Sequence, residues 1–349
     1  MDRHTEAVDV YSILKPVFFV SKTLGLSPYI VVGDSGNRRV IVRVSALIVT
    51  IGMLTLNVGQ LAYGVLTAIF TWENICDFGE SIISIETLCV ALCAYCTCLA
   101  GCRQTVKHFA RLNDVIGETY YSAWRRDSQL LLVMQVLFVI MILTAGVLDI
   151  SQAISEVYDF HTLLFCMLYY VSELAGFMSE HQFVAFMHVL KRTVQNWNNH
   201  IDATSKNDVI YSPLYKNETN RRKSVLFVVS NNSVTSKNET IYSKMMHFKQ
   251  LTELHACACD IAESVNAVYS PMLLMCVAKS STSLTHILYY ILYSYFVQKT
   301  NFFCKLTGNE SYFVWLIYSS VRLFWLVYSA TLTAKEVSHN VLYFKLLNN

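Results

Sequence analysis

The stretch that decides the fold reads Leu251-Thr-Glu-Leu-His-Ala-Cys-Ala-Cys-Asp-Ile-Ala-Glu-Ser-Val265 and becomes almost purely apolar towards Val297. In its first half, apolar residues recur at steps of three and four, which is the pattern of an amphipathic helix. The second half, from Ser280 to Val297, contains no charged residue. The pattern predicts a water-facing helix that continues directly into a membrane-crossing one.

The composition of the whole chain points to the same class of protein. Of its 349 residues, 54% are hydrophobic and only 15% are charged, whereas an ordinary soluble domain has about 25% charged residues. A net charge of +2, with basic residues distributed over several loops, does not indicate a nucleic-acid partner. The sequence therefore predicts an all-α, polytopic membrane protein whose partner is the lipid bilayer.

Six segments are long and apolar enough to cross a bilayer, for which a helix needs about 20 residues. They are Val44–Phe70, Ser81–Gly101, Gln129–Leu148, Thr162–Leu190, Ser280–Val297 and Tyr312–Thr333. The chain then divides into an N-terminal segment (1–43), four spans (44–190), a loop with a mobile centre and helical ends (191–266), two spans (267–333) and a short tail (334–349). Pro16, Gly25 and Pro28 interrupt the N-terminal segment, so it is expected to lie at the membrane interface or to pack at the cytoplasmic side rather than to span.

The Lys and Arg residues of the loops predict the orientation of the chain. Residues 1–43 carry six, 102–128 five and 191–266 ten, whereas 71–80 and 149–161 carry none and 298–311 carries two. Basic loops stay in the cytoplasm. The N-terminus and the tail are therefore predicted to be cytoplasmic, which is inverted relative to G-protein-coupled receptors.

Charged residues inside the predicted spans are costly and indicate function. Glu173 and Arg322 lie at similar depths below the outer ends of their helices, which permits a buried ion pair; alternatively, each snorkels or faces a wet cavity. Glu86 is expected to face an outer vestibule or a polar ligand. Glu180 is placed near the cytoplasmic end, where cations of the loops would meet it.

Aromatic residues gather in the predicted outer halves of three helices, together with His286. Apolar walls with a few hydroxyl groups and one or two charges are typical of a pocket for a small organic molecule, although an aromatic belt at the membrane surface is the alternative. The candidate ligand-binding residues are Glu86, Phe165, Tyr169, Tyr170, Glu173, His286, Tyr289, Tyr290, Trp315, Tyr318 and Arg322.

Motifs of enzymes are absent from the sequence. It contains no Walker loop, GxSxG or GxGxxG motif in a usable context, so no catalytic residue, cofactor or metal site is predicted. His181 and His188 are seven residues apart, and HExxH is absent, which favours packing over metal binding. Of the glycosylation sequons, only the one at Asn309 lies in a predicted outer loop, so only Asn309 is expected to carry a glycan.

Three stretches of the chain resemble insect gustatory receptors, which belong to the seven-transmembrane chemoreceptor superfamily. They are Tyr11-Ser-Ile-Leu-Lys-Pro-Val-Phe-Phe-Val-Ser-Lys-Thr-Leu-Gly-Leu-Ser-Pro-Tyr29, the run Leu254 to Leu274 with Asn266 ahead of an apolar span, and Thr331-Leu-Thr-Ala-Lys-Glu-Val-Ser-His-Asn340. The resemblance covers nearly the whole chain, and its motifs are degenerate.

The resemblance implies a ligand-gated, non-selective cation channel in the plasma membrane of sensory neurons. It also implies assembly as a homo- or hetero-tetramer, a cytoplasmic anchor built by extensions of the later helices, and a tastant pocket open to the outer face. The family's seventh helix, which starts with Thr-Tyr and lines the pore, is not found before Asn349. A truncated version, a splice form or a decayed copy would each explain that, and each would put channel activity in question. An insect odorant receptor, a G-protein-coupled receptor and a transporter are the alternative interpretations.

Overall fold

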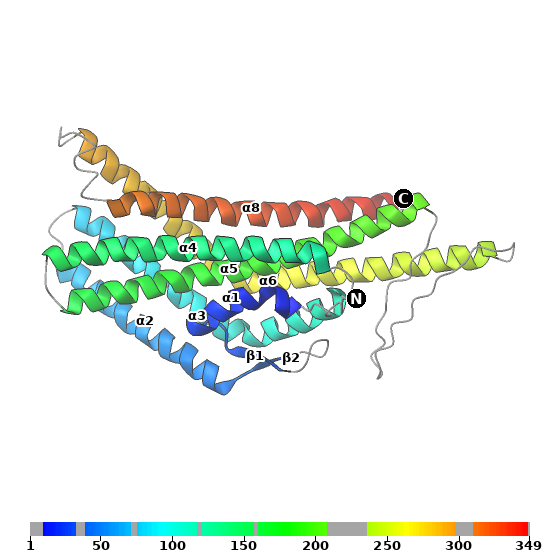
Figure 1. The fold of residues 1–349 in the computed structure, drawn as a ribbon, viewed down its shortest axis with the longest axis horizontal. Coiled ribbons are helices and arrows are strands. Elements are labelled where there is room, and N and C mark those ends of the chain that lie inside the picture. Colours follow the sequence, from blue (N-terminus) through cyan, green and yellow to red (C-terminus); the bar gives the residue numbers. More distant parts are fainter. Residues whose placement is uncertain are drawn as a thin grey trace, which may run out of the picture.

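The protein is a bundle of long helices with a small hairpin beside it (Figure 1). The computed structural model describes residues 10–32, 39–70, 75–116, 121–156, 160–207, 236–296 and 310–347. The elements are α1 (Val10–Thr23), β1 (Tyr29–Val32), β2 (Arg39–Val42), α2 (Val44–Phe70), α3 (Ile75–Ile116), α4 (Tyr121–Glu156), α5 (Phe160–Asn207), α6 (Ser236–Phe296) and α8 (Glu310–Leu347). The asparagine of the predicted glycosylation site, Asn309, lies outside the described residues.

The outward faces of several helices are apolar, as a bilayer requires. On α2, the side chains of Val44, Ile48 and Ile69 are 73%, 65% and 65% exposed, and on α4 that of Val147 is 67% exposed. Five helical segments are long and apolar enough to cross a membrane: Val44–Leu66, Ser81–Lys107, Ser128–Ser151, Ala256–Leu292 and Tyr312–Thr333. Apolar surface of this extent is stable in contact with lipid rather than water. The chain is therefore a helical, multi-pass membrane protein, as the composition predicted.

Helix α5, which contains the predicted fourth span, is the central helix of the bundle. It packs against α1, α3, α4, α6 and α8, and Figure 1 shows it running beside α4 and α8. Its middle is buried continuously from Ala175 to Phe186. The buried polar residues of this stretch lower its hydropathy, and α5 is not among the five apolar segments found in the described part of the chain. A helix that faces protein on all sides tolerates polar side chains that a lipid-facing helix does not.

Helix α5 also approaches α3 very closely at Gly176. A Cβ atom added there would lie 2.8 Å from Cγ1 of Val90, which is shorter than a normal van der Waals contact. A similar approach joins α3 to α6, where a Cβ on Gly101 would lie 2.6 Å from Cγ1 of Val268. Small residues at such crossings let membrane helices pack backbone to backbone, so α3, α5 and α6 form a tight core.

Helix α6 continues without interruption through Pro271 and Lys279. The sequence placed the fifth span at Ser280–Val297 because that stretch is free of charge. In the structure, the apolar segment is longer and starts at Ala256, and Lys279 lies inside it. The lysine is compatible with the span because its side chain is only 6% exposed and turns into the bundle. The amphipathic half and the apolar half of the opening stretch thus form one helix.

The N-terminal segment, residues 10–28, packs against the bundle. Its helix α1 buries Leu14, Val17 and Phe18 against α5 and α4, and Pro16 lies within the helix rather than ending it. After α1, Gly25 adopts φ +74°, a left-handed conformation that glycine adopts without strain. The following strands β1 and β2 pair antiparallel, with Tyr29 opposite Val42; this hairpin is the only β-structure among the residues described.

Side chains from several helices hold this turn by its backbone. The Thr50 hydroxyl of α2 donates to the carbonyl of Gly25 at 2.5 Å, the Tyr95 hydroxyl of α3 to that of Leu24 at 3.0 Å, and Gln182 Nε2 of α5 to that of Leu26 at 3.2 Å. The Tyr269 hydroxyl of α6 in turn donates to Gln182 Oε1 at 3.2 Å. The turn at residues 24–26 is therefore connected by hydrogen bonds, directly or through Gln182, to four helices.

Candidate functional site

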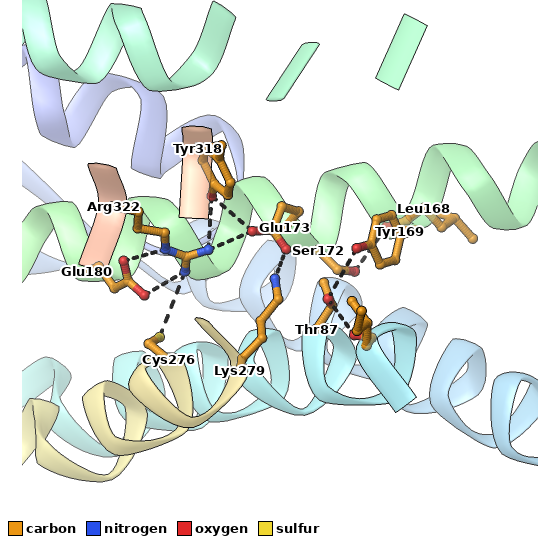
Figure 2. A network of polar contacts seen from close by, with 11 residues as sticks. Thr87, Leu168, Tyr169, Ser172, Glu173, Glu180, Cys276, Lys279, Tyr318 and Arg322 are labelled. Carbon is orange, nitrogen blue, oxygen red and sulfur yellow. Dashed lines mark hydrogen bonds and ion pairs between the residues drawn. The ribbon is translucent and has the colours of Figure 1, made fainter. Parts of the chain in front are cut away.

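Four charged side chains meet in the middle of the bundle and are called the ion cluster below: Glu173 and Glu180 of α5, Lys279 of α6 and Arg322 of α8. Arg322 lies between the two carboxylates, with Nη1 at 2.6 Å from Glu173 Oε1 and Nη2 at 2.5 Å from Glu180 Oε1 (Figure 2). Its Nε donates to Glu180 Oε2 at 2.7 Å. Lys279 Nζ pairs with the other oxygen of Glu173. The cluster thus joins three helices.

The cluster is buried and balanced in charge. Its side chains are between 0% and 6% exposed. Taking one ion out of water costs several kcal/mol even after relaxation, and that cost is offset only when a counter-ion and further hydrogen bonds are present. Here two carboxylates face two cations, and Arg322 binds Glu180 through two parallel hydrogen bonds, the strongest geometry for this pair. Removing any one member would leave the buried charges of the cluster unbalanced.

Tyr318 connects the cluster to a group of aromatic rings. Its hydroxyl donates to Glu173 Oε1 at 2.9 Å and lies 2.9 Å from Arg322 Nη1, from which it accepts. Its ring packs edge-on against Trp315, with centroids 5.3 Å apart, and against Phe138 of α4 at 5.8 Å. A single residue therefore contacts the charges through its hydroxyl and the rings through its face and edge.

The aromatic group consists of Tyr169, Tyr170, Trp315 and Tyr318. Tyr170 lies nearly parallel to Trp315, at 22° and 6.1 Å between centroids, and Tyr169 stands edge-on to Tyr170, at 89° and 5.2 Å. The Tyr170 hydroxyl donates to Oδ2 of Asp149 on α4, and Trp315 Nε1 donates to the same oxygen at 3.4 Å. The group lies towards the end of the bundle at which α4 finishes and α5 and α8 begin.

Six of the predicted ligand-binding residues therefore come together. They are Tyr169, Tyr170, Glu173, Trp315, Tyr318 and Arg322.

The other five predicted residues lie elsewhere. Phe165 packs against Tyr63 of α2, with ring centroids 5.8 Å apart. Tyr290 stacks on Tyr312 at 4.6 Å, and Tyr289, on the same helix α6, is 47% exposed. His286, also on α6, is partly buried. Glu86 of α3 is near Thr282 and Lys279 of α6, at the edge of the ion cluster.

The charged residues also test two expectations from the sequence. The ion pair between Glu173 and Arg322 is present. The expectation that Glu180 meets cations of the loops is wrong, because its partner is Arg322 of α8. Lys279 was missed, since the predicted span was drawn to begin one residue after it. Asp149 was also missed, because it follows the apolar run of α4 and was counted with a loop.

The ligands of a metal ion do not converge in the part of the chain that the structure describes: no three His, Cys, Asp or Glu side chains are grouped there as a metal site requires. His181 of α5 is buried and stacks on Phe177, with ring centroids 5.6 Å apart. The chemistry that the site offers is therefore that of hydrogen bonds, ion pairs and aromatic faces.

The fold is similar to that of a solved membrane receptor. Among solved structures, the chain is similar to the insect olfactory receptor OR5 from Machilis hrabei, with a TM-score of 0.61 over 93% of this chain and 80% of that one. The two sequences are 13% identical, so the likeness is one of fold. A scan against models of protein families gave no match, and a search among curated proteins gave none either.

Proposed function

We propose that this chain is a chemosensory receptor subunit of the insect gustatory type, which detects a small-molecule tastant at the plasma membrane of sensory neurons. The observation that carries the proposal is the fold shared with an insect olfactory receptor over 93% of the chain. The six converging site residues add to it, since aromatic rings, hydroxyl groups and a few charges are the lining that a small organic ligand requires.

The geometry suggests how such a receptor would respond. A ligand that contacts Trp315 or Tyr169 would shift the ring of Tyr318, whose hydroxyl is bonded to Glu173 at 2.9 Å. Because Glu173 joins α5 to α6 and α8, that shift would change how these helices pack. A ligand acts in this way only if it binds one arrangement of the helices better than the other. The response would be cation current through a homo- or hetero-tetramer.

Two features distinguish the proposal from its alternatives. The fold neighbour is an olfactory receptor, which favours an odorant receptor as the second candidate; the gustatory assignment rests on the resemblance of the segment Tyr11–Tyr29. A cytoplasmic N-terminus, expected from the basic loops, separates both from a G-protein-coupled receptor.

The proposal is tested by expressing the full chain in cells, alone and with a second chemoreceptor subunit, with an epitope tag at the N-terminus. We expect the tag to be stained only after permeabilisation, and a panel of tastants and odorants to include one that evokes cation current. A tag accessible on intact cells would overturn the orientation. A surface-expressed chain that neither binds nor responds to any compound, alone or with partners, would overturn the receptor function.

A further inference from the structure

The carboxylate of Asp149 has an uneven set of hydrogen bonds. Both of its donors, the Tyr170 hydroxyl and Trp315 Nε1, bind the same oxygen, Oδ2. Within the described ranges, Oδ1 accepts no hydrogen bond and no cationic side chain pairs with Asp149. The residue is only partly buried. Two aromatic donors therefore orient this carboxylate and leave one oxygen available.

The charges around Asp149 do not neutralise it. In the ion cluster, Glu173 and Glu180 are matched by Lys279 and Arg322, so both of the buried cations there are already bonded to carboxylates. Among the described side chains, the aromatic group and Asp149 together therefore carry one net negative charge. A ligand that brings a positive charge would complete the balance, whereas an anion would be repelled at this position.

The rings beside Asp149 have the geometry that suits such a ligand. Tyr170 and Trp315 lie nearly parallel to each other, with Tyr169 edge-on to both at 5.2 and 6.4 Å, and the first two reach the carboxylate through the hydroxyl and the indole N–H. All three side chains are partly exposed. Cations bind over the faces of Trp and Tyr within about 6 Å of the ring centroid, and aromatic groups of this kind recognise quaternary ammonium ions.

We infer that Asp149, Tyr170 and Trp315 recognise an organic ammonium ion, with the cation paired to Asp149 Oδ1 and held against the rings. This inference rests on the proposed receptor function and names the ligand class of the same site. The alternative is that Asp149 is simply hydrated beside an aromatic belt at the membrane surface, in which case charge on the ligand would make no difference.

The inference is tested with two compounds of nearly the same shape, benzyltrimethylammonium and its neutral isostere neopentylbenzene. Binding to the purified full chain in lipid nanodiscs is followed by tryptophan fluorescence and calorimetry. We expect the ammonium compound to bind about 5- to 30-fold more tightly than the isostere, since a cation held by rings gains roughly 1–2 kcal/mol. Asp149→Asn, which removes the ion pair and keeps the rings, should reduce this preference and leave the affinity for the isostere unchanged.

Two further variants keep the result interpretable. If Asp149→Asn fails to fold, Trp315→Leu takes its place in the test. It retains the carboxylate and removes the ring, so it should weaken binding of the ammonium compound. Asp260→Asn, which changes an exposed carboxylate of α6, should have no effect. Equal affinity for the two compounds, no binding of either, or an unchanged preference in the folded Asp149→Asn protein would overturn the inference. Currents evoked by neutral compounds alone would do the same while leaving the receptor function intact.

Discussion

The ion cluster and the N-terminal segment both tie helices together through buried polar groups, but they use different chemistry. In the ion cluster, Glu173, Glu180 and Arg322 carry full charges inside the bundle. At the N-terminal segment, neutral donors such as Thr50 and Gln182 bind backbone carbonyl oxygens. A lost neutral bond costs about 1–3 kcal/mol, whereas an unpaired buried charge costs more. Two sets of contacts that connect helices in a similar way can therefore differ widely in how much stability a single mutation removes.

The largest effect is expected from Arg322→Met. The change removes the cation that pairs with Glu180 and leaves two buried carboxylates facing one lysine. Breaking a buried ion pair in this way costs about 3–5 kcal/mol. We expect little folded protein, measured by size-exclusion chromatography and thermal melting in detergent. A melting temperature equal to that of the parent chain would mean that the cluster is hydrated.

Gln182→Leu tests the other side of the comparison. It removes the donor to the Leu26 carbonyl and the acceptor of the Tyr269 hydroxyl, at an expected cost of about 1–3 kcal/mol because both groups remain buried. The melting temperature should fall, but by less than for Arg322→Met. Faster proteolysis within residues 10–28 than elsewhere would show that the N-terminal segment is released. A larger loss than that of Arg322→Met would reverse the ranking.

Tyr318→Phe separates stability from response. The ring contacts with Trp315 and Phe138 remain, and the hydroxyl bonded to Glu173 is lost. We expect a loss of about 1–2 kcal/mol in stability. We also expect a ligand-evoked response reduced more strongly than ligand affinity, as measured by paired binding and current recordings. Tyr95→Phe, which removes another buried hydroxyl that donates to the Leu24 carbonyl and lies outside the ion cluster, is the matched control. Equal reductions of affinity and response in Tyr318→Phe would remove Tyr318 as the connection between rings and charges.

Thr50→Val should have the smallest effect. It removes one hydroxyl donor to the carbonyl of Gly25 and retains the shape of the side chain, so the expected loss is about 1 kcal/mol. Raising the salt concentration should not change the difference between this variant and the parent chain. At 0.1 M salt, interactions between exposed charges more than about 10 Å apart are largely screened, whereas interactions of buried groups are screened much less. A drop in melting temperature as large as that of Gln182→Leu would show that the turn depends mainly on α2.

The sequence was sufficient for the class of fold and for half of the ion cluster. Charges in apolar segments stand out, and similar depths suggested the pairing of Glu173 with Arg322. Lys279 did not stand out, because a charge was taken as the boundary of a span rather than as a member of one. The partner of Glu180 depended on how α5 and α8 align, which no local pattern records.

The N-terminal contacts were beyond the reach of sequence for a different reason. The N-terminal segment was expected to lie at the membrane interface or to pack at the cytoplasmic side, and the structure shows that it packs against the bundle. The donors to it, Thr50, Tyr95 and Gln182, are ordinary residues of long helices, and their acceptors are backbone carbonyl groups that carry no side-chain signature. Likewise, the convergence of Asp149 with Tyr170 and Trp315 comes from three separate helices. Residues that come together from separate helices in this way can be identified only once the packing of the helices is known.

The central claim, that Glu180 and Arg322 form one buried unit between α5 and α8, is tested most directly by a double-mutant cycle. Thermal or denaturant unfolding in detergent would be compared for the parent chain, Glu180→Gln, Arg322→Met and the combined variant. Because the combined variant retains the balanced pair of Glu173 with Lys279, we predict that it is more stable than Arg322→Met alone. Additive losses, with the combined variant the least stable of the four, would contradict the account.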